Sequence, residues 1–326
     1  MSFSGFTLLG GIYGAGVRTR NALYDRGVLR ARRLRGPVVS VGNLSVGGSG
    51  KTPFVVLLGE LLKDRGVKFD ILSRGYGRKT RGVALVDPAG SAHEFGDEPV
   101  LMARRLEVPV VVGEDRYEAG RFAENRFGPQ LHILDDGFQH RALARDFDIV
   151  MVTPEDARDR LLPRGRMREP LRSLGRADAV VLVSGASSGS FPVEGKLTWQ
   201  VRRGISVRHT PARPVAFCGI ARPQNFFRQL HTANIQPVAE ASYRDHHSYS
   251  ERDIRELLDL CRVGEGGGFI TTEKDAINLG SNLSALQPLA VVQVRMKLSD
   301  APNAMDTLLR VVKERMAAHE KIPLPR

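Results

Sequence analysis

One glycine-rich stretch limits the possible folds of this 326-residue chain more than any other feature. The apolar, β-branched run Val38–Val41 leads into Gly47-Gly48-Ser49-Gly50-Lys51-Thr52, and the apolar periodic segment Phe54–Leu62 follows. A strand, a glycine-rich loop and a helix in this order are typical of a phosphate-binding P-loop. Glycines let backbone N–H groups approach phosphate oxygens, while Lys51 can reach the outer phosphates and the Thr52 hydroxyl can bind Mg²⁺.

The stretch departs from the strict P-loop pattern at one position. The pattern has glycine six residues before Lys51, where this chain has Ser45. A glycine-rich turn of purely structural use is the alternative, but the order of strand, glycines, lysine and threonine favours a nucleotide. We therefore predict that the nucleotide phosphates contact Ser45, Val46, Gly47, Gly48, Ser49, Gly50, Lys51 and Thr52.

Two acidic stretches are candidates for a metal site or for catalysis. The apolar strand predicted at Leu131–Leu134 ends in Asp135-Asp136, which downstream of a P-loop is the Walker B arrangement that holds Mg²⁺. A simple turn is the alternative, but two adjacent carboxylates repel each other without a cation. Asp97 and Glu98 open a predicted helix, where acidic residues often serve only as cap and dipole partners. Sequence alone leaves that second choice open.

Composition indicates an anionic partner and no disulfide framework. The 48 basic and 36 acidic residues give a net charge of +12, which suits nucleic acid, an acidic membrane surface or a phosphorylated substrate. The two cysteines, Cys218 and Cys261, have no metal-ligand spacing. A nucleic-acid-dependent ATPase is disfavoured because the arginines gather beside an apolar segment and do not alternate with aromatic residues; we expect no nucleic-acid partner.

The first 35 residues combine an apolar segment with a basic one. Phe6, Leu9, Tyr13 and Val17 recur at helical spacing, and seven arginines follow between Arg18 and Arg35. A secretory signal would carry its charge before the apolar part, and the segment is too short to span a bilayer. It predicts an interfacial helix on an anionic leaflet, and hence a peripheral membrane protein. A helix packed on the core is the alternative.

The remaining patterns predict an α/β fold in two parts. Strands alternate with helices on both sides of Ser184–Ser190, which implies mostly parallel sheets. Lys196–His209 suggests a two-stranded ribbon or linker. We predict an N-terminal membrane-associating segment (1–35), a P-loop NTPase-like core (36–190), a β-ribbon linker (191–214) and a second, smaller α/β domain (215–326). A loop with several charges, Leu161–Pro170, is either a phosphate-binding or a solvated loop.

Taken together, these motifs resemble the tetraacyldisaccharide 4′-kinase family of lipid A biosynthesis. The Ser45 departure is itself typical of that family. The stretches that carry the resemblance are Val41-Gly42-Asn43, Gly47–Pro53, Arg74–Gly77, Gly96–Pro99, Asp135–His140, Leu161–Pro170, Phe217–Phe227, Asp245-His246-His247 and Thr271–Asp275.

The resemblance implies an ATP- and Mg²⁺-dependent lipid kinase on the cytoplasmic face of the inner membrane of a Gram-negative bacterium. Its acceptor would be the 4′-hydroxyl of a tetraacylated glucosamine disaccharide 1-phosphate, and its product lipid IV-A. It also implies two α/β/α domains joined by a two-stranded linker, with the active site between them. We expect a monomer. The rival is a P-loop GTPase or metallochaperone-type NTPase, but Thr272-Glu273-Lys274-Asp275 has the wrong spacing for a guanine signature.

The resemblance also implies roles for individual residues. Asp97 is similar to the family's catalytic base and His246 to its partner, which we expect to meet across the cleft when it closes. The implied metal group is Glu98, Glu169 and the pair Asp135-Asp136, of which either could touch Mg²⁺. Arg116 and Arg168 are implied to serve the charged nucleotide site.

Overall fold

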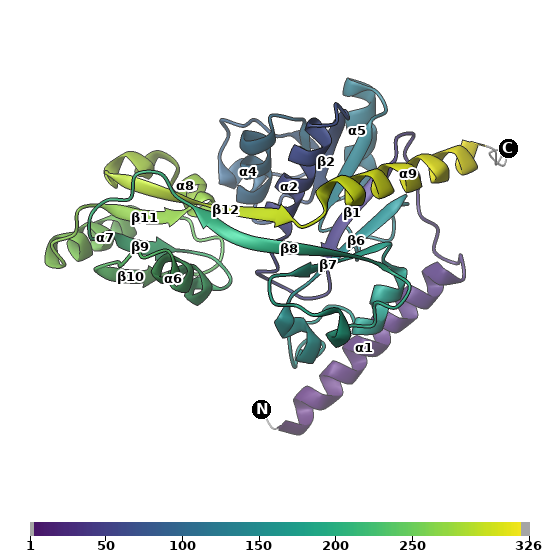
Figure 1. The fold of residues 1–326 in the computed structure, drawn as a ribbon, viewed down its shortest axis with the longest axis horizontal. Coiled ribbons are helices and arrows are strands. Elements are labelled where there is room, and N and C mark those ends of the chain that lie inside the picture. Colours follow the sequence, from purple (N-terminus) through teal and green to yellow (C-terminus); the bar gives the residue numbers. More distant parts are fainter. Residues whose placement is uncertain (1–2, 321–326) are drawn as a thin grey trace.

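The computed structural model describes residues 3–320, with side chains from residue 10 to residue 319. Its strands form a continuous sheet of 12 strands in the order β10-β9-β11-β12-β8-β7-β6-β1-β5-β2-β4-β3. Figure 1 shows that this sheet carries two lobes, joined by the long strands β8 and β12. We call strands β1–β7 with their helices the first lobe, and strands β9–β11 with α6–α8 the second lobe.

The first lobe is a parallel sheet covered on both faces. Its strands are parallel except for the short edge strand β3, and most of their residues are buried. Alternate residues of each strand face opposite cores, as the pleat requires: Val39 and Val41 pack towards α2, α4 and α9, whereas Val38 packs towards α5. The strands are β1 (Val38–Asn43), β2 (Phe69–Ser73), β3 (Ala84–Leu85), β4 (Val110–Val112), β5 (Leu131–Asp135), β6 (Phe147–Val152) and β7 (Ala179–Val183). The helices are α2 (Lys51–Lys63), α3 (Ala92–Phe95), α4 (Asp97–Leu106) and α5 (Arg116–Phe127).

The second lobe repeats the design on a smaller scale. Phe217 and Phe269 face a core closed by α7, while Ala216 and Ile270 face a core closed by α6. Its elements are β9 (Val215–Cys218), α6 (Pro223–Thr232), β10 (Ala239–Ser242), α7 (Glu251–Val263), β11 (Phe269–Thr272) and α8 (Glu273–Leu279). The predicted α/β class with a mostly parallel sheet is confirmed.

The connection between the lobes differs from the ribbon expected within Lys196–His209. That segment forms one strand, β8 (Leu197–Ser206), which pairs in parallel with β7 over Leu197–Val201. Its antiparallel partner comes from the far end of the chain: β12 (Leu289–Leu298) pairs with β11 first and then with β8. The linker has two strands, but no local turn joins them, so local patterns could not identify the second one.

The C-terminal helix also differs from expectation. Helix α9 (Ala301–Glu320), which the sequence assigned to the second part of the chain, buries Met305 and Leu308 in the core of the first lobe. The chain therefore returns to its first lobe at the end. The four residue ranges proposed from sequence stay a prediction.

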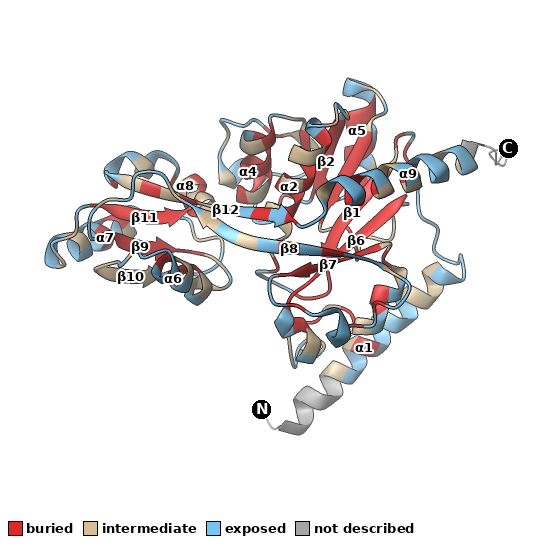
Figure 2. Cartoon of the chain, viewed as in Figure 1, coloured by how far each residue is buried: buried red, intermediate tan, exposed pale blue. Residues whose placement is uncertain are grey.

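The N-terminal helix α1 (Phe3–Asp25) lies against the first lobe and projects beyond it towards the N-terminus (Figures 1 and 2). From residue 10 onward half of its residues are exposed, and Ile12 keeps 61% of its surface accessible. Phe6 and Leu9, on which the membrane interpretation partly rests, lie outside the residues whose side chains are described. Of the helices described, none has both the length and the apolar character needed to cross a bilayer.

Candidate active site

A cavity of about 910 Å³ lies where the carboxyl ends of the first-lobe strands face the second lobe. Parallel α/β sheets gather ligand contacts at this edge. Both lobes and the β8–β12 linker contribute to its walls. Its polar lining includes Ser49, Lys51, Thr52, Ser73, Arg74, Tyr76, Glu98, Arg116, Asp135, Asp136, Gln139, His140, Arg168, Arg203, Arg222, Asp245, His246 and Lys274.

The P-loop forms the floor of the cavity. Gly50 caps α2 with φ 85°, a left-handed conformation that favours glycine, and Met296 Cε lies only 2.5 Å from where a Cβ would be. The positive end of α2 thus points at the cavity, as an anion site needs. Lys51 Nζ donates to Asn43 Oδ1 at 2.9 Å and lies 3.4 Å from Asp136 Oδ1.

The two aspartates after β5 have opposite environments. Asp136 accepts two hydrogen bonds from the Arg168 guanidinium, at 2.8 and 2.9 Å. Burial opposes its ionisation, but Lys51 and Arg168 hold the pKa of Asp136 well below its usual range. Asp135 accepts one bond from Ser73 at 3.0 Å, and its Oδ1 is buried with no partner in the described structure. Burial, with Glu98 and Asp136 nearby, raises the pKa of Asp135 to about 7.

Asp97 and His246 meet across the lobes. His246 Nδ1 lies 2.9 and 2.8 Å from the two carboxylate oxygens of Asp97, although 149 residues separate the two in sequence. Asp97 is 3% exposed and also accepts bonds from the Glu98 backbone N–H and from Asn278. Burial would raise the pKa of Asp97, but the hydrogen bond from His246 and the charge of Lys274 keep it below its ordinary value. Burial would lower the pKa of His246, but Asp97 raises it.

The proton positions in this pair follow from chemistry. An ionised carboxylate can only accept, so Nδ1 of His246 carries the hydrogen. In the neutral ring, Nε2 then has a free lone pair. His246 lines the cavity and Asp97 does not. The pair therefore presents a potential proton acceptor to the cavity through its histidine.

Lys274 is a site residue that the sequence reasoning missed. It lies in the first turn of α8 and forms an ion pair with Glu98 of α4, 176 residues away. Burial would raise the pKa of Glu98, but Lys274 holds it below its usual range. The sequence did hold a signal for Lys274: it follows closely on a predicted strand, and the carboxyl ends of parallel strands line ligand sites in α/β folds. Asn43, whose Oδ1 accepts from both Lys51 and Arg168, was missed as well.

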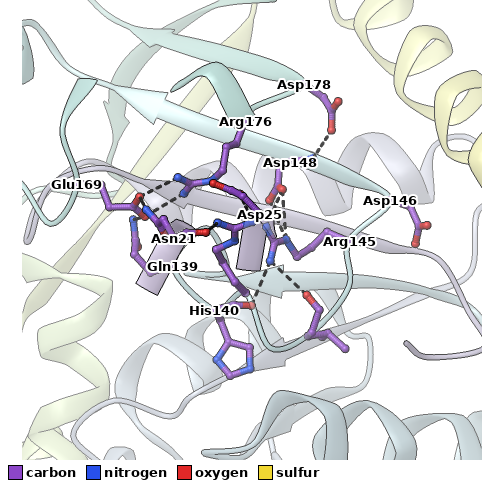
Figure 3. Close-up of polar contacts among 12 residues, drawn as sticks. Asn21, Asp25, Gln139, His140, Arg145, Asp146, Asp148, Glu169, Arg176 and Asp178 are labelled. Atoms are coloured by element: carbon purple, nitrogen blue, oxygen red, sulfur yellow. Dashed lines mark hydrogen bonds and ion pairs between the residues drawn. The ribbon is translucent and has the colours of Figure 1, made fainter. Parts of the chain in front are cut away.

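The loop that carries Arg168 is held by Glu169 and by α1. Both oxygens of Glu169 bind the Arg176 guanidinium, at 2.9 and 3.0 Å, and Asn21 of α1 donates to it at 2.8 Å (Figure 3). Tyr13 of α1 donates to the Arg168 carbonyl at 3.1 Å. Glu169 is 3% exposed and does not line the cavity.

Most of the sequence-predicted residues thus converge on one cavity. Val46–Thr52, Glu98, Arg116, Asp135, Asp136, Arg168 and His246 line it. Three predicted residues do not: Asp97 reaches it through His246, Glu169 is tied to Arg176, and Ser45 is buried beside Met167. Arg116 donates to the Glu114 carbonyl at 2.8 Å, and burial lowers its pKa.

Comparison with known proteins places this cavity in a family. The family model described as Tetraacyldisaccharide-1-P 4′-kinase matches residues 5–313. The chain belongs to this family. The resemblance inferred from the motifs is therefore confirmed, and the family assignment covers both lobes.

Individual relatives agree with the family model over nearly the whole chain. The tetraacyldisaccharide 4′-kinase of Koribacter versatilis is 51% identical over 317 residues, covering 94% of this chain and 98% of that protein. The enzyme of the same name from Aquifex aeolicus is 41% identical over 280 residues, covering 81% and 85%. A crystal structure of the "apo" form of LpxK from Aquifex aeolicus in complex with ATP has a TM-score of 0.80 and 36% identity, covering 95% of this chain and 99% of that one.

Proposed function

We propose that this member of the tetraacyldisaccharide 4′-kinase family transfers the γ-phosphoryl group of ATP to the 4′-hydroxyl of a tetraacylated glucosamine disaccharide 1-phosphate. The product would be lipid IV-A. The observation that carries the proposal is the Asp97–His246 hydrogen bond at the cavity floored by the P-loop. It puts a proton acceptor beside a phosphate-binding loop, which a kinase for a hydroxyl acceptor needs.

The nucleotide would lie with its phosphates on the P-loop. Backbone N–H groups of Gly47–Thr52 and the start of α2 offer donors, and Lys51 offers a charge for the outer phosphates. Arg116 and Arg168 extend the positive lining next to that loop. A relative of this family was solved in complex with ATP, which supports ATP as the donor.

The residues present fit a Mg²⁺ ion. Among the described residues no three His, Cys, Asp or Glu side chains already form a ligand set. Mg²⁺ at phosphate sites usually takes only one or two carboxylates, the rest of its shell being phosphate and water. The partnerless Oδ1 of buried Asp135, next to Glu98, is a position that a cation would satisfy. We therefore assign Asp135, Glu98 and Thr52 as its holders. Bound there, Mg²⁺ would neutralise charge on the transferred phosphoryl group.

Two of the predicted metal ligands then have other roles. Asp136 is held by Arg168 and Lys51, so we propose that it orients these two cations. Glu169 is bound by Arg176 and Asn21, so we propose that it fixes the loop that presents Arg168. Neither needs to touch the metal.

In the proposed reaction, His246 Nε2 accepts the proton of the 4′-hydroxyl as the oxygen attacks the γ-phosphorus. Asp97 holds Nδ1–H and stabilises the imidazolium that forms. The oxygen–phosphorus bond to the acceptor forms while the bond from the γ-phosphorus to the bridging oxygen breaks, leaving ADP. Asp97 thus acts with His246 as one unit, and His246 supplies the atom that faces the acceptor.

We further propose that α1 and the basic segment that follows it hold the protein on the anionic cytoplasmic surface of the inner membrane, as a monomer. Arg18, Arg26 and Arg30 are exposed, and their side chains form no ion pair or hydrogen bond with the described residues. Arg32, Arg33 and Arg35, also expected at the membrane, are paired with acids of the first lobe. The membrane contact would therefore use the first set.

One assay tests this function directly. The purified protein is incubated with ATP, Mg²⁺ and the tetraacylated disaccharide 1-phosphate in detergent, and the lipid product is analysed by mass spectrometry. A second phosphate on the distal sugar is expected, with ATP preferred over GTP. Hydrolysis of nucleotide without a phosphorylated lipid, or a preference for GTP, would favour the NTPase alternative.

A further inference from the structure

His246 is held in an unfavourable backbone conformation by a loop that is anchored elsewhere. Its φ of 58° is left-handed, a conformation that is unfavourable for a residue with a side chain. Such a conformation persists only where the surroundings impose it. The His246 N–H donates to the Gly219 carbonyl at 3.1 Å, so the loop is hydrogen-bonded to the residue that follows β9.

Gly219 is in turn held by a buried acid. Its N–H donates to Asp275 Oδ1 at 2.7 Å, and Asp275 is fully buried. A Cβ on Gly219 would lie 2.9 Å from the Arg244 carbonyl oxygen and 3.2 Å from Asp275 Oδ1, so only glycine lets these segments meet.

Asp275 also holds the C-terminal end of the loop that carries His246. Tyr249, 5% exposed, donates its hydroxyl to the same Oδ1 at 2.8 Å. The second oxygen, Oδ2, accepts from Thr272 Oγ1 at 2.5 Å, which fixes the carboxylate at the start of α8. One carboxylate therefore ties β9, the His246 loop and α8 together.

We propose that Asp275 is a positioning residue, which anchors the Tyr243–Tyr249 loop at His246, through Gly219, and at its C-terminal end, through Tyr249, and so holds His246 against Asp97. This inference rests on the proposed function, because His246 is there the proton acceptor. Asp275 does not line the cavity, and among the described residues it pairs with no cation. Its carboxylate accepts hydrogen bonds from Gly219, Tyr249 and Thr272. Asp275 follows Lys274 in α8, so this helix positions both the lysine that pairs with Glu98 and the carboxylate that anchors the His246 loop.

Tyr249→Phe is the mildest test, since it removes one hydroxyl and keeps the buried ring. We expect kcat to fall roughly 10- to 100-fold, as for loss of one hydrogen bond to a charged group, with the KM for ATP unchanged. Tyr243→Phe is the matched control, because that neighbouring hydroxyl makes no hydrogen bond with the described residues. In a His246→Ala background, Tyr249→Phe should change kcat less than about twofold. Equal losses in both backgrounds, or a normal kcat in Tyr249→Phe, would overturn the inference.

Asp275 itself is tested by two substitutions. Asp275→Asn keeps an oxygen for Gly219 and Tyr249 and should retain most of the activity, whereas Asp275→Ala should lose at least as much as Tyr249→Phe. Equal activity of the two variants would count against the anchor.

A measurement that does not depend on turnover separates this inference from the proposed function. In protein labelled with ¹⁵N-histidine, the His246 ring signal is identified by its loss in His246→Ala. It should shift in Tyr249→Phe and stay in place in Tyr243→Phe, whether or not His246 is the base. An unmoved signal refutes the anchor, while a shifted signal with full activity in His246→Ala refutes only the proposed base.

Discussion

Replacing either member of the Asp97–His246 pair should remove proton transfer and leave nucleotide binding nearly intact. In Asp97→Asn, one amide oxygen would have to serve three donors that now share two carboxylate oxygens: His246 Nδ1, the Glu98 N–H and Asn278 Nδ2. The imidazole would no longer be held in the tautomer that leaves Nε2 free, and a forming imidazolium would lose its counter-charge.

The magnitude follows from what a positioned base contributes. Such groups typically supply about 10²- to 10⁴-fold, so Asp97→Asn and His246→Ala should each lower kcat by that range. The KM for ATP should change less than about threefold, because neither side chain forms a hydrogen bond or ion pair with the P-loop in the described structure. Since the two residues act as a unit, the double variant should be little slower than either single one.

The assay is the disaccharide phosphorylation reaction, with ATP affinity measured separately by binding. His231 and Glu240 provide a matched control: a second histidine–carboxylate pair, 2.7 Å apart, on the outer side of the second lobe. His231→Ala and Glu240→Gln should leave kcat unchanged. Fully multiplicative losses in the Asp97–His246 double variant would refute the pairing. A large loss of Mg²⁺-ATP binding in Asp97→Asn would instead move that residue to the metal.

Three further predictions concern the P-loop, pH and the membrane. Lys51→Ala should lower kcat on the order of 10²-fold or more through lost charge stabilisation, while Lys63→Ala at the other end of α2 should not; equal effects would contradict the P-loop assignment. Because the base must be neutral, kcat should rise with pH through the raised pKa of His246, and a flat profile between about pH 6 and 9 would contradict it. Because the pKa of His246 is higher in the folded than in the unfolded protein, the Asp97–His246 pair stabilises the fold fully below about pH 6.5. This stabilisation decreases as the pH rises through the pKa of His246 in the folded protein, so His246→Ala should lower Tm more at low pH than at high pH. Finally, each arginine at an anionic membrane contributes about 1 kcal/mol, so changing three exposed arginines to glutamine should weaken binding to anionic vesicles roughly 100-fold at low salt. The same change at three arginines of α7 should leave vesicle binding unchanged. If the two triple variants bind the vesicles equally well, α1 has only a structural role. The first set is Arg18, Arg26 and Arg30, and the α7 control set is Arg252, Arg255 and Arg262.

Features fixed by neighbouring residues could be predicted from the sequence. The β-branched run Val38–Val41 became the buried strand β1, and the glycines after it form the loop at the start of α2. Asp135 and Asp136 lie at the end of β5, as the apolar run before them indicated. These signals are local: the alternation of a strand, the period of a helix and the left-handed conformation of a glycine each involve only a few neighbouring residues.

Contacts between distant segments were mostly beyond such patterns. Nothing near Lys274 indicates that it pairs with Glu98, since that contact depends on how α8 packs on α4. The different surroundings of Asp135 and Asp136 also depend on a residue distant in sequence, because Arg168 binds Asp136 and not Asp135. Glu169 illustrates the converse: its residue type suits a metal, but Arg176 and Asn21 already occupy its oxygens.

The register of the linker decides whether the Asp97–His246 pair can form at all. Strand β12 leaves β11 at Val292, then pairs antiparallel with β8 from Gln293 opposite Ser206 to Leu298 opposite Val201. Met296 on this strand packs against Gly50 of the P-loop. Since a slip of one residue turns every side chain of a strand to the opposite face, a shifted β12 would remove Met296 from the P-loop and displace the second lobe. The two strands therefore set the distance between His246 and Asp97, although neither strand carries a member of the pair.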